Sequence, residues 1–573
     1  MKRLFPYIKP YGWFIALALA IKFVATSMDL FIPSLMQTII DEKVPEGKMA
    51  PILILGGLMI LCALCALTGN IIANRMSAKS AGEITRKLRH DLFTKLENLS
   101  AKQMDKLTIS SAISRLTSDS YNVNQMLARV QRIGIRAPIL LVGGMIMMLT
   151  KDWVLALVLI SLMPILSFVI VFTTKKSLPL RFKAQEHLDD MVQVSQENIT
   201  GIRVIKALSK TEHERKRFDK VNTALSGTTL KADMYTILSG PSTTILLNLG
   251  LTLVVLVGAY RVNGGAVKPG VIIAFLQYFN MILMATMGIT RIFIMWATGE
   301  ASAQRIAQVL EIQPELQVQA GGITQEEQPA HIEFRDVTFS YTGVGKNLEN
   351  MNFRLEHGQT LGILGPTGSG KSTIINLLLR FYDPDAGQVL IDGQDIRTMD
   401  YETLRDKFGV VFQNDFVAEG TIADNIRFFR PLDEAALEKA AQSAQAEFIR
   451  EKEGRMEAPV AVRGNNLSGG QKQRLLIGRA LAADPEILIL DDASSALDYQ
   501  TDANLRRALR ENYRNTTTVM VAQRVSSLQH ADLILVLEDG KIIGAGKHSQ
   551  LLETCEEYRI IAETQMGEGK EGV

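Results

Sequence analysis

The chain has 573 residues, a formal net charge of +2 and 47% hydrophobic residues. This length exceeds what one hydrophobic core can organise and predicts two or three folded units, while the near-neutral charge gives no general case for nucleic-acid binding. Cys62, Cys65 and Cys555 are too few and too badly spaced for a disulfide framework, which indicates a reducing cytosol for the soluble part.

Several apolar runs before residue 300 are long enough to cross a bilayer, which takes about 20 residues. The start of the chain could imitate a signal peptide, but its apolar stretch continues past the usual length of about 7–15 residues and shows no clear cleavage site. We therefore predict a short interfacial helix and then a first membrane span. The six predicted spans lie at roughly 12–38, 51–74, 133–150, 153–174, 239–260 and 270–297.

Lysine and arginine are concentrated in two long segments between these runs. Residues 76–132 and 175–238 hold 10 and 12 of them, whereas the turns at 41–50, 151–152 and 261–269 together hold five. By the positive-inside rule the two long segments face the cytoplasm, and both termini and the soluble half then fall on the same side.

The long segments keep the periodicity of helices. Ile84, Leu88, Leu92 and Leu96, for example, fall on one helical face. This pattern predicts that spans two to five continue as helices well into the cytoplasm. The alternative is that the loops form separate soluble domains.

The second half of the chain has a different pattern. A polar stretch with glycine and proline at 311–330 predicts a linker. From His331 onward, short apolar strands alternate with helices. The sequence thus predicts an all-α transmembrane domain of six helices over 1–310, followed by a cytosolic α/β domain over 331–573.

A glycine-rich loop lies between a predicted strand and an amphipathic helix in the stretch LGILGPTGSGKSTIINLLL. The backbone N–H groups of such a loop and the helix N-terminus face phosphate oxygens, a lysine reaches the β- and γ-phosphates, and a serine can bind Mg²⁺. The soluble domain is therefore predicted to bind a nucleoside triphosphate. The predicted contacts are Gly365, Thr367, Gly368, Ser369, Gly370, Lys371, Ser372 and Thr373.

Asp491 ends the apolar strand EILILD and is the expected partner of that Mg²⁺. An acid at the end of a strand is often only a cap. Its occurrence together with a phosphate-binding loop favours the metal-binding interpretation.

Another motif, Leu467-Ser468-Gly469-Gly470-Gln471, opens a helix and would supply further backbone donors, although the chain already has its own phosphate loop. It resembles the signature of ATP-binding cassette (ABC) transporters, where it completes the ATP site of an opposing domain. This resemblance implies ATP and Mg²⁺ as ligands. It also implies Tyr341 as the aromatic residue that stacks on adenine, Gln413 as the Q-loop residue that touches Mg²⁺, and Asp498 as the D-loop residue.

The membrane half is similar to the exporter branch of this family. Residues 110–120 and 197–218 resemble the two cytoplasmic loops whose short coupling helices rest on the nucleotide-binding domains, and residues 301–306 resemble the exit of the sixth span. Because each ATP site of the family is split between two domains, the resemblance implies a second half-transporter chain as partner. It also implies a place in the bacterial plasma membrane.

Two residues depart from the family's pattern in the same site. Asp492 stands where the family's catalytic Glu follows Asp491, and Gln523 stands where its switch-loop His is expected. The shorter side chain loses about 1.5 Å of reach, more than a base can tolerate when it must lie within about 2.6–3.2 Å of a water. Glutamine can neither carry the charge of an imidazolium nor shuttle a proton. We therefore expect slow hydrolysis in this chain's own site.

This pattern resembles one subunit of a heterodimeric bacterial multidrug ABC exporter. We predict ATP-driven export of hydrophobic or amphiphilic compounds, with a partner that has Glu and His at the positions of Asp492 and Gln523 and uses the intact signature of this chain. The alternatives are a dedicated lipid or peptide exporter, a homodimeric exporter, and an ATP-gated channel or regulator that transports nothing.

Charged residues inside the predicted spans are candidates for substrate contact. Lys22 and Asp29 lie seven residues apart and hence on one helical face, and they could equally pair with each other or with a neighbouring helix. Arg291 could snorkel or line the cavity. The Met-rich stretch at 279–296 either packs the spans or offers the adaptable surface of a promiscuous site.

Overall fold

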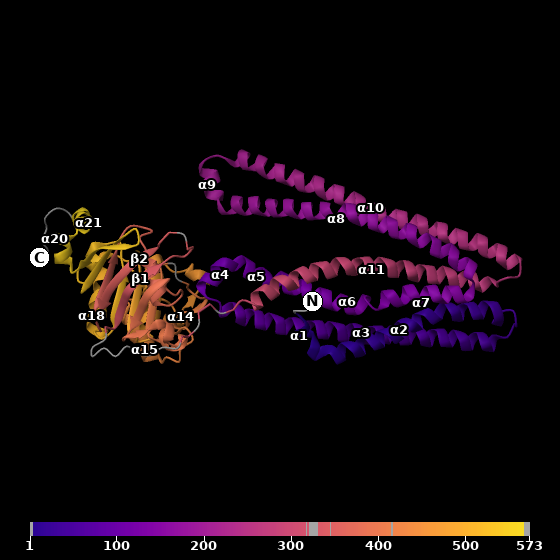
Figure 1. The fold of residues 1–573 in the computed structure, drawn as a ribbon, viewed down its shortest axis with the longest axis horizontal. Helices are drawn as coiled ribbons and strands as arrows, with labels where there is room; N and C mark the ends of the chain where they lie inside the picture. Colours follow the sequence, from indigo (N-terminus) through magenta and orange to yellow (C-terminus); the bar gives the residue numbers. More distant parts are fainter. Residues whose placement is uncertain are drawn as a thin grey trace. The chain divides into compact units, whose positions relative to one another are not determined.

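A computed structural model of the chain divides into two compact units, which we treat separately (Figure 1). The membrane unit comprises Met1–Glu97 and Ser110–Ile312, and the cassette unit comprises Asn98–Ile109 and Gln313–Val573. Most of the predicted linker at 311–330 falls outside the described residues. The structure describes residues 4–313, 315–316, 318–319, 330–343, 345–413 and 416–566.

The membrane unit is built from long apolar helices. Within the described residues, six helical stretches are long and apolar enough to cross a membrane, and each contains one of the six predicted runs. This confirms the predicted six-span architecture. The main helices are α2 (Gly12–Thr38), α3 (Met49–Glu97), α6 (Ser120–Ile133), α7 (Arg136–Lys151), α8 (Trp153–Thr200), α10 (Thr211–Asn263) and α11 (Pro269–Leu310); α1 (Phe5–Ile8), α5 (Ile109–Ser114) and α9 (Ile202–Ala207) are short.

Helix α3 continues without a break for 49 residues, far beyond the length of a bilayer crossing. The apolar stripe from Ile84 to Leu96 is buried along this extension, where Ile84, Leu88 and Leu92 are fully buried. Helices α8 and α10 are similarly long and run side by side, joined by α9 (Figure 1). The segments between the spans are therefore extended helices and not separate loop domains.

The cassette unit is an α/β structure with two main sheets. A six-stranded sheet has the order β12-β11-β3-β10-β9-β6 and is parallel except for β12, and an antiparallel sheet has the order β2-β1-β4-β5. The predicted α/β class is confirmed. The strands are β1 (Ile332–Phe339), β2 (Leu348–Leu355), β3 (Thr360–Leu364), β4 (Ala386–Ile391), β5 (Gln394–Asp395), β6 (Phe408–Val411), β9 (Ile487–Asp491), β10 (Thr517–Val521), β11 (Leu533–Glu538) and β12 (Lys541–Gly546), with β7 (Gly420–Thr421) and β8 (Pro459–Val460) as a separate pair.

Burial explains why the central strands read as unbroken apolar runs. Every residue of β9 and β10 is buried, because helices cover a parallel sheet on both faces. The helices are α12 (Lys371–Leu378), α13 (Tyr401–Asp406), α14 (Ile422–Arg427), α15 (Glu434–Ser443), α16 (Phe448–Glu451), α17 (Gly469–Leu481), α18 (Tyr499–Asn512), α19 (Val525–Leu528), α20 (His548–Thr554) and α21 (Glu556–Met566).

One helix of the cassette unit comes from the first half of the sequence, namely α4 (Ala101–Leu107). The Tyr382 hydroxyl donates a hydrogen bond to Asp105 Oδ2 at 2.7 Å, and burial together with this carboxylate raises the pKa of Tyr382. The helix that packs on the cassette core thus precedes the stretch 110–120, which belongs to the membrane unit.

Candidate nucleotide-binding site

The predicted site residues gather at the carboxyl ends of the parallel strands. In the register of the sheet, Val521 at the end of β10 pairs with Ile363 of β3 on one side and with Asp491 of β9 on the other. Loops that leave adjacent parallel strands at one edge of a sheet form the usual ligand crevice of an α/β fold. The phosphate loop, the acidic pair and the switch-loop residue therefore meet here.

The loop after β3 has a backbone that only glycine suits at some positions. Gly370 has φ +100°, and a Cβ there would lie 2.6 Å from a methyl carbon of Leu348 and 2.9 Å from the Asn347 carbonyl oxygen. Lys371 begins α12, and its ammonium group donates to the carbonyl oxygens of Gly365 at 2.8 Å and Pro366 at 2.6 Å. The loop thus wraps around the ammonium group of Lys371, the first residue of α12.

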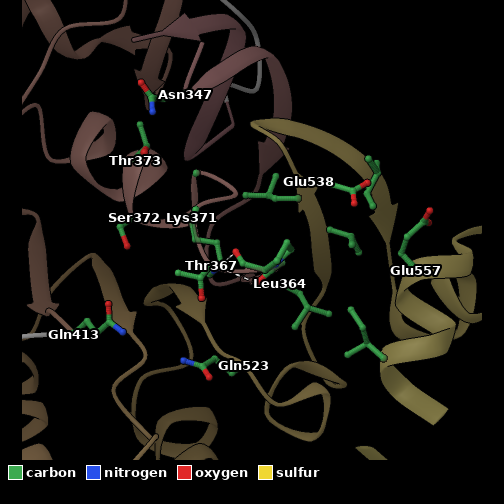
Figure 2. Close-up of a pocket in the computed structure, with 18 of the residues that line it drawn as sticks. Asn347, Leu364, Thr367, Lys371, Ser372, Thr373, Gln413, Gln523, Glu538 and Glu557 are labelled. Carbon is green, nitrogen blue, oxygen red and sulfur yellow. Dashed lines mark hydrogen bonds between the residues drawn. The ribbon is translucent and has the colours of Figure 1, made fainter. Parts of the chain in front are cut away.

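A cavity of about 790 Å³ opens over this loop (Figure 2). The buried Ser369 hydroxyl has no hydrogen-bond partner among the described residues. Unlike the other predicted contacts of the phosphate loop, Ser369 does not line this cavity. The predicted residues that line the cavity are Tyr341, Gly365, Thr367, Gly368, Gly370, Lys371, Ser372, Thr373, Gln413 and Gln523.

The residues predicted to hold Mg²⁺ lie close together. Ser372 Oγ donates to Asp491 Oδ2 at 3.2 Å, and Gln413 lines the cavity beside Ser372. Burial raises the pKa of Asp491 and lowers the pKa of Lys371. A hydroxyl, a carboxylate and an amide oxygen are the hard oxygen ligands that Mg²⁺ prefers, so the donor set fits this ion.

Tyr341 lies at the edge of the cavity with its ring held by other aromatic rings. It makes edge-on contacts with Phe339 and Tyr382, at centroid distances of 4.9 and 5.0 Å. Its hydroxyl accepts a hydrogen bond from the Asn376 amide at 2.9 Å. The ring is therefore fixed in orientation at the cavity, and its stacking on adenine stays a prediction.

The two residues that depart from the family's pattern contact each other. Gln523 Nε2 donates to Asp492 Oδ2 at 3.0 Å. Burial raises the pKa of Asp492, and the hydrogen bond from Gln523 opposes this effect. Asp492 has a left-handed backbone with φ +53°, and its N–H donates to the Val521 carbonyl at 3.0 Å. Aspartate is among the few residues with a side chain that adopt this conformation readily.

The signature motif lies apart from this cavity. Ser468 caps α17 and forms a reciprocal capping box with Gln471, which holds the helix N-terminus in place. None of the described residues 467–471 (Leu467, Ser468, Gly469, Gly470, Gln471) lines the cavity over the phosphate loop. Its backbone donors are therefore not aimed at the site of the same chain.

Asp498, predicted as the D-loop residue, caps the next helix. Its carboxylate accepts from the Thr501 N–H at 2.9 Å and the Thr501 hydroxyl at 2.8 Å, at the start of α18. These two hydrogen bonds lower the pKa of Asp498. Asp-x-x-Thr before a helix is itself a capping pattern, so the sequence supports a structural role for this residue beside the predicted one.

Sequence reasoning missed one wall of the cavity. This wall is lined by Glu538 of β11 and by Glu557, Ile560 and Gln565 of α21. None of these residues belongs to a motif that the sequence shows. Gln565 also accepts from the Val525 N–H and donates to the Gln523 carbonyl oxygen, both at 2.8 Å. The last described helix thus holds the switch loop through its backbone, a contact that only the folded chain brings about.

Comparisons with known proteins agree with this geometry. Residues 15–287 match the family described as the ABC transporter transmembrane region, and residues 348–495 match the family described as ABC transporter. An uncharacterized ABC transporter ATP-binding protein, YfiB of Bacillus subtilis, is 32% identical over 577 aligned positions that cover 100% of both chains. An ATP-dependent lipid A-core flippase of Vibrio vulnificus is 28% identical and covers 99% of this chain and 98% of its own.

A solved structure, a bacterial Atm1-family ABC exporter with ATP bound, has the same fold with a TM-score of 0.81. The sequences are 23% identical, and the match covers 98% of this chain and 99% of that chain. The family matches extend over both halves of the chain, and full-length relatives share about a third of its residues. The chain belongs to the ABC transporter family, with a six-span transmembrane region and the ATP-binding ATPase that drives transport in one polypeptide.

Proposed function

We propose that this chain is one half of a heterodimeric exporter of hydrophobic or amphiphilic compounds in a bacterial plasma membrane, with both termini and the cassette unit in the cytoplasm. Its own ATP site hydrolyses slowly, and its signature motif completes a faster site on the partner chain. Closure of the paired cassettes on ATP converts an inward-facing cavity to an outward-facing one. The slow site retains ATP through several cycles.

The hydrogen-bonded pair of Asp492 and Gln523 is the observation on which this proposal rests. A general base contributes on the order of 10²–10⁴ in rate, or about 3–5 kcal/mol of barrier. The carboxylate of an aspartate lies about 1.5 Å closer to the backbone than that of a glutamate. In addition, the neutral amide of Gln523 donates a hydrogen bond to the Asp492 carboxylate. Two deficits in direct contact are more consistent with a specialised slow site than with unrelated substitutions.

Other residues of the site bind the metal ion, the phosphates and the base. Mg²⁺, when bound, would neutralise the charge of the phosphates during hydrolysis, and Ser372, Asp491 and Gln413 would hold it; the hydrogen bond between Ser372 and Asp491 supports this assignment. Lys371 and the loop before it bind the phosphates, and Tyr341 stacks on the base.

Exposed apolar surface on the membrane unit supports a dimer. In and around α9, Ile199, Val204 and Leu208 are 76%, 61% and 64% exposed. These residues lie more than 20 positions beyond the predicted end of the fourth span, so lipid does not account for them. Contiguous exposed apolar side chains in water mark interaction sites, and a partner's cassette is the occupant that the family resemblance implies.

Purification of the chain alone tests the proposal. We expect the isolated chain to bind ATP and to show ATPase activity on the order of 10²-fold below that of the reconstituted pair. Robust ATPase activity of the chain alone, abolished by Asp492→Asn, would establish a homodimer and reject the heterodimer. The partner gene product should carry Glu and His at the two positions and an altered signature.

A dedicated exporter of an anionic lipid is a second candidate, favoured by an excess of positive charge in the membrane unit. Lys22, Arg132 and Arg136 lie close enough to interact electrostatically, with Asp29 as the acid among them. Asp29 pairs with Arg136 at 3.3 Å, and Lys22 donates to the Asn74 side chain at 3.1 Å. The Arg132 Nε atom is buried without a partner in the described part of the chain. Uncompensated charge within a membrane is costly, so an anionic headgroup would stabilise this cluster.

A cavity of about 450 Å³ gives such a compound a place to bind. It is lined by Asp29 and Arg136 together with apolar residues that include Leu140, Met281 and Met284. A lining that combines charged side chains with adaptable methionine side chains suits an amphiphile. The side chain of Arg291, also considered from the sequence, lies outside the described residues.

Two amphiphiles with the same tail separate the candidates. If the substrate is anionic, dodecyl phosphate stimulates ATPase activity of the reconstituted pair, dodecyltrimethylammonium does not, and Arg136→Gln removes the difference. Equal stimulation by both compounds supports broad multidrug export. Stimulation by neither, with no ATP-driven uptake into inside-out vesicles, would support a regulator and contradict both candidates.

A further inference from the structure

Three potential metal ligands meet at the end of the cassette sheets opposite the nucleotide site. His331 directly precedes β1, His357 lies in the turn between β2 and β3, and Asp392 directly follows β4. The antiparallel register brings these ends together, since Ile332 at the start of β1 pairs with Leu355 at the end of β2 and with Ile391 at the end of β4. The phosphate loop, by contrast, leaves the other end of β3.

His331 has an unused ring nitrogen in a buried place. The residue is 1% exposed, and its Nδ1 lies 2.6 Å from the Thr517 hydroxyl oxygen. Its Nε2 is buried and has no hydrogen-bond partner among the described residues. A buried polar atom without a partner destabilises the fold, and a metal ion bound to it would remove that cost.

The other two ligands adjoin this ring. The His357 imidazole stacks on that of His331 with 3.9 Å between ring centroids, and its Nε2 lies 2.9 Å from Asp392 Oδ1. One ligand atom from each of the three side chains lies within 4.8 Å of the other two. Neutral imidazoles and a carboxylate are the ligands that zinc sites with an open position use.

The charged side chains around the cluster carry a net negative charge, which favours a bound cation. Lys407 Nζ lies 3.4 Å from Asp392 Oδ2, on the oxygen that does not face His357, and Lys407 also pairs with Glu486. With both histidines neutral, the two carboxylates outnumber the lysine by one negative charge.

We propose that His331, His357 and Asp392 form a binding site for a divalent metal ion of the zinc class, with water in the fourth position. Zinc–nitrogen bonds of about 2.0–2.1 Å place tetrahedral ligands roughly 3.4 Å apart, so the cluster must contract. His357 is the ligand that moves, because its side chain is 61% exposed and the parallel rings cannot both direct a nitrogen at one ion. The site is distinct from the predicted Mg²⁺ site in position and in ligand type.

Cobalt substitution of the full-length chain tests this site directly. The chain, purified without a polyhistidine tag and stripped with chelator, is titrated with Co²⁺ in the absence of nucleotide. We expect one equivalent to bind and to give visible absorption bands typical of a four-coordinate site, with displacement by Zn²⁺. His357→Ala and Asp392→Asn should each weaken Co²⁺ binding by at least tenfold.

Matched controls separate the site from adventitious binding. His530→Ala removes an exposed histidine elsewhere in the cassette unit and should leave the titration unchanged. Unaltered binding of a fluorescent ATP analogue shows that the two ligand variants are folded. Equal metal binding by the parent chain, His357→Ala and Asp392→Asn would overturn the proposal, as would a parent chain that binds no Co²⁺ or Zn²⁺ at all.

Discussion

Under the proposed function, replacing both departing residues, Asp492→Glu together with Gln523→His, should accelerate ATP hydrolysis in this chain's own site. In the structure, Gln523 Nε2 lies 3.0 Å from Asp492 Oδ2, so the two side chains are already in contact. A glutamate would extend the carboxylate by about 1.5 Å, and a base must lie within about 2.6–3.2 Å of the water that it activates. A histidine would supply a donor that can also carry charge.

The expected decrease in the activation barrier of hydrolysis exceeds the expected loss of folding stability. Restoring a general base lowers the barrier by about 3–5 kcal/mol, or 10²–10⁴ in rate. Position 492 has φ +53°, and a left-handed backbone costs residues other than Gly, Asn and Asp about 1–2 kcal/mol. This cost falls on the stability of the cassette unit. The double variant should therefore melt at a slightly lower temperature while it hydrolyses ATP on the order of 10²-fold faster.

Single-turnover hydrolysis of radiolabelled ATP by the reconstituted pair in nanodiscs, with the phosphate-binding lysine of the partner chain replaced by alanine, measures the gain. Each single variant and Lys371→Ala, which removes the phosphate-binding lysine, serve as controls. A double variant that binds ATP with unchanged affinity, retains its fold and hydrolyses no faster than the parent would refute the idea that reach and charge at these two positions limit the site.

Three other substitutions test the site from different sides. Asp492→Asn should raise the melting temperature at neutral pH, because burial raises the pKa of this carboxyl group and thus disfavours its charged form in the folded state; calorimetry at pH 5 and pH 8 should show the advantage of the variant grow with pH. Gln565→Ala removes two hydrogen bonds to the switch-loop backbone, worth about 1 kcal/mol each, and should lower ATPase activity several-fold without a change in nucleotide affinity, as equilibrium binding would show. Tyr382→Phe removes the hydrogen bond to Asp105 of α4 and should preserve basal ATPase activity but diminish its stimulation by transported compounds.

The architecture could be predicted from the sequence because its causes are local. Long apolar runs have few alternatives to membrane helices, and the stripe of Ile84, Leu88, Leu92 and Leu96 fixes a buried helical face, as observed. The phosphate loop was also predictable, since glycine is needed where φ is positive and a side chain would collide with Leu348 at position 370.

Contacts between distant parts of the chain could not be predicted in this way. The hydrogen bonds of Gln565 with the switch loop span about 40 residues, and the bond of Tyr382 with Asp105 spans 277. Neither glutamine nor tyrosine on a helix or loop signals such a partner. The cluster of His331 with His357 was equally invisible, because antiparallel pairing of separate strands brings the two residues together.

The backbone conformation at position 492 favours aspartate there. Its left-handed conformation is held from both sides, since the Asp492 N–H donates to the Val521 carbonyl and the Asp492 carbonyl accepts from the Ser495 hydroxyl at 2.9 Å. The loop therefore fixes where the side chain starts, and only the length of the side chain decides where the carboxylate ends. A glutamate placed there would reach beyond Gln523, whereas the aspartate meets it in a hydrogen bond. The short acid and the neutral amide thus fit one another. Under the proposed function, replacing Asp492 by Glu or Gln523 by His alone should therefore disrupt this contact without producing a fast site, and only the double replacement should accelerate hydrolysis.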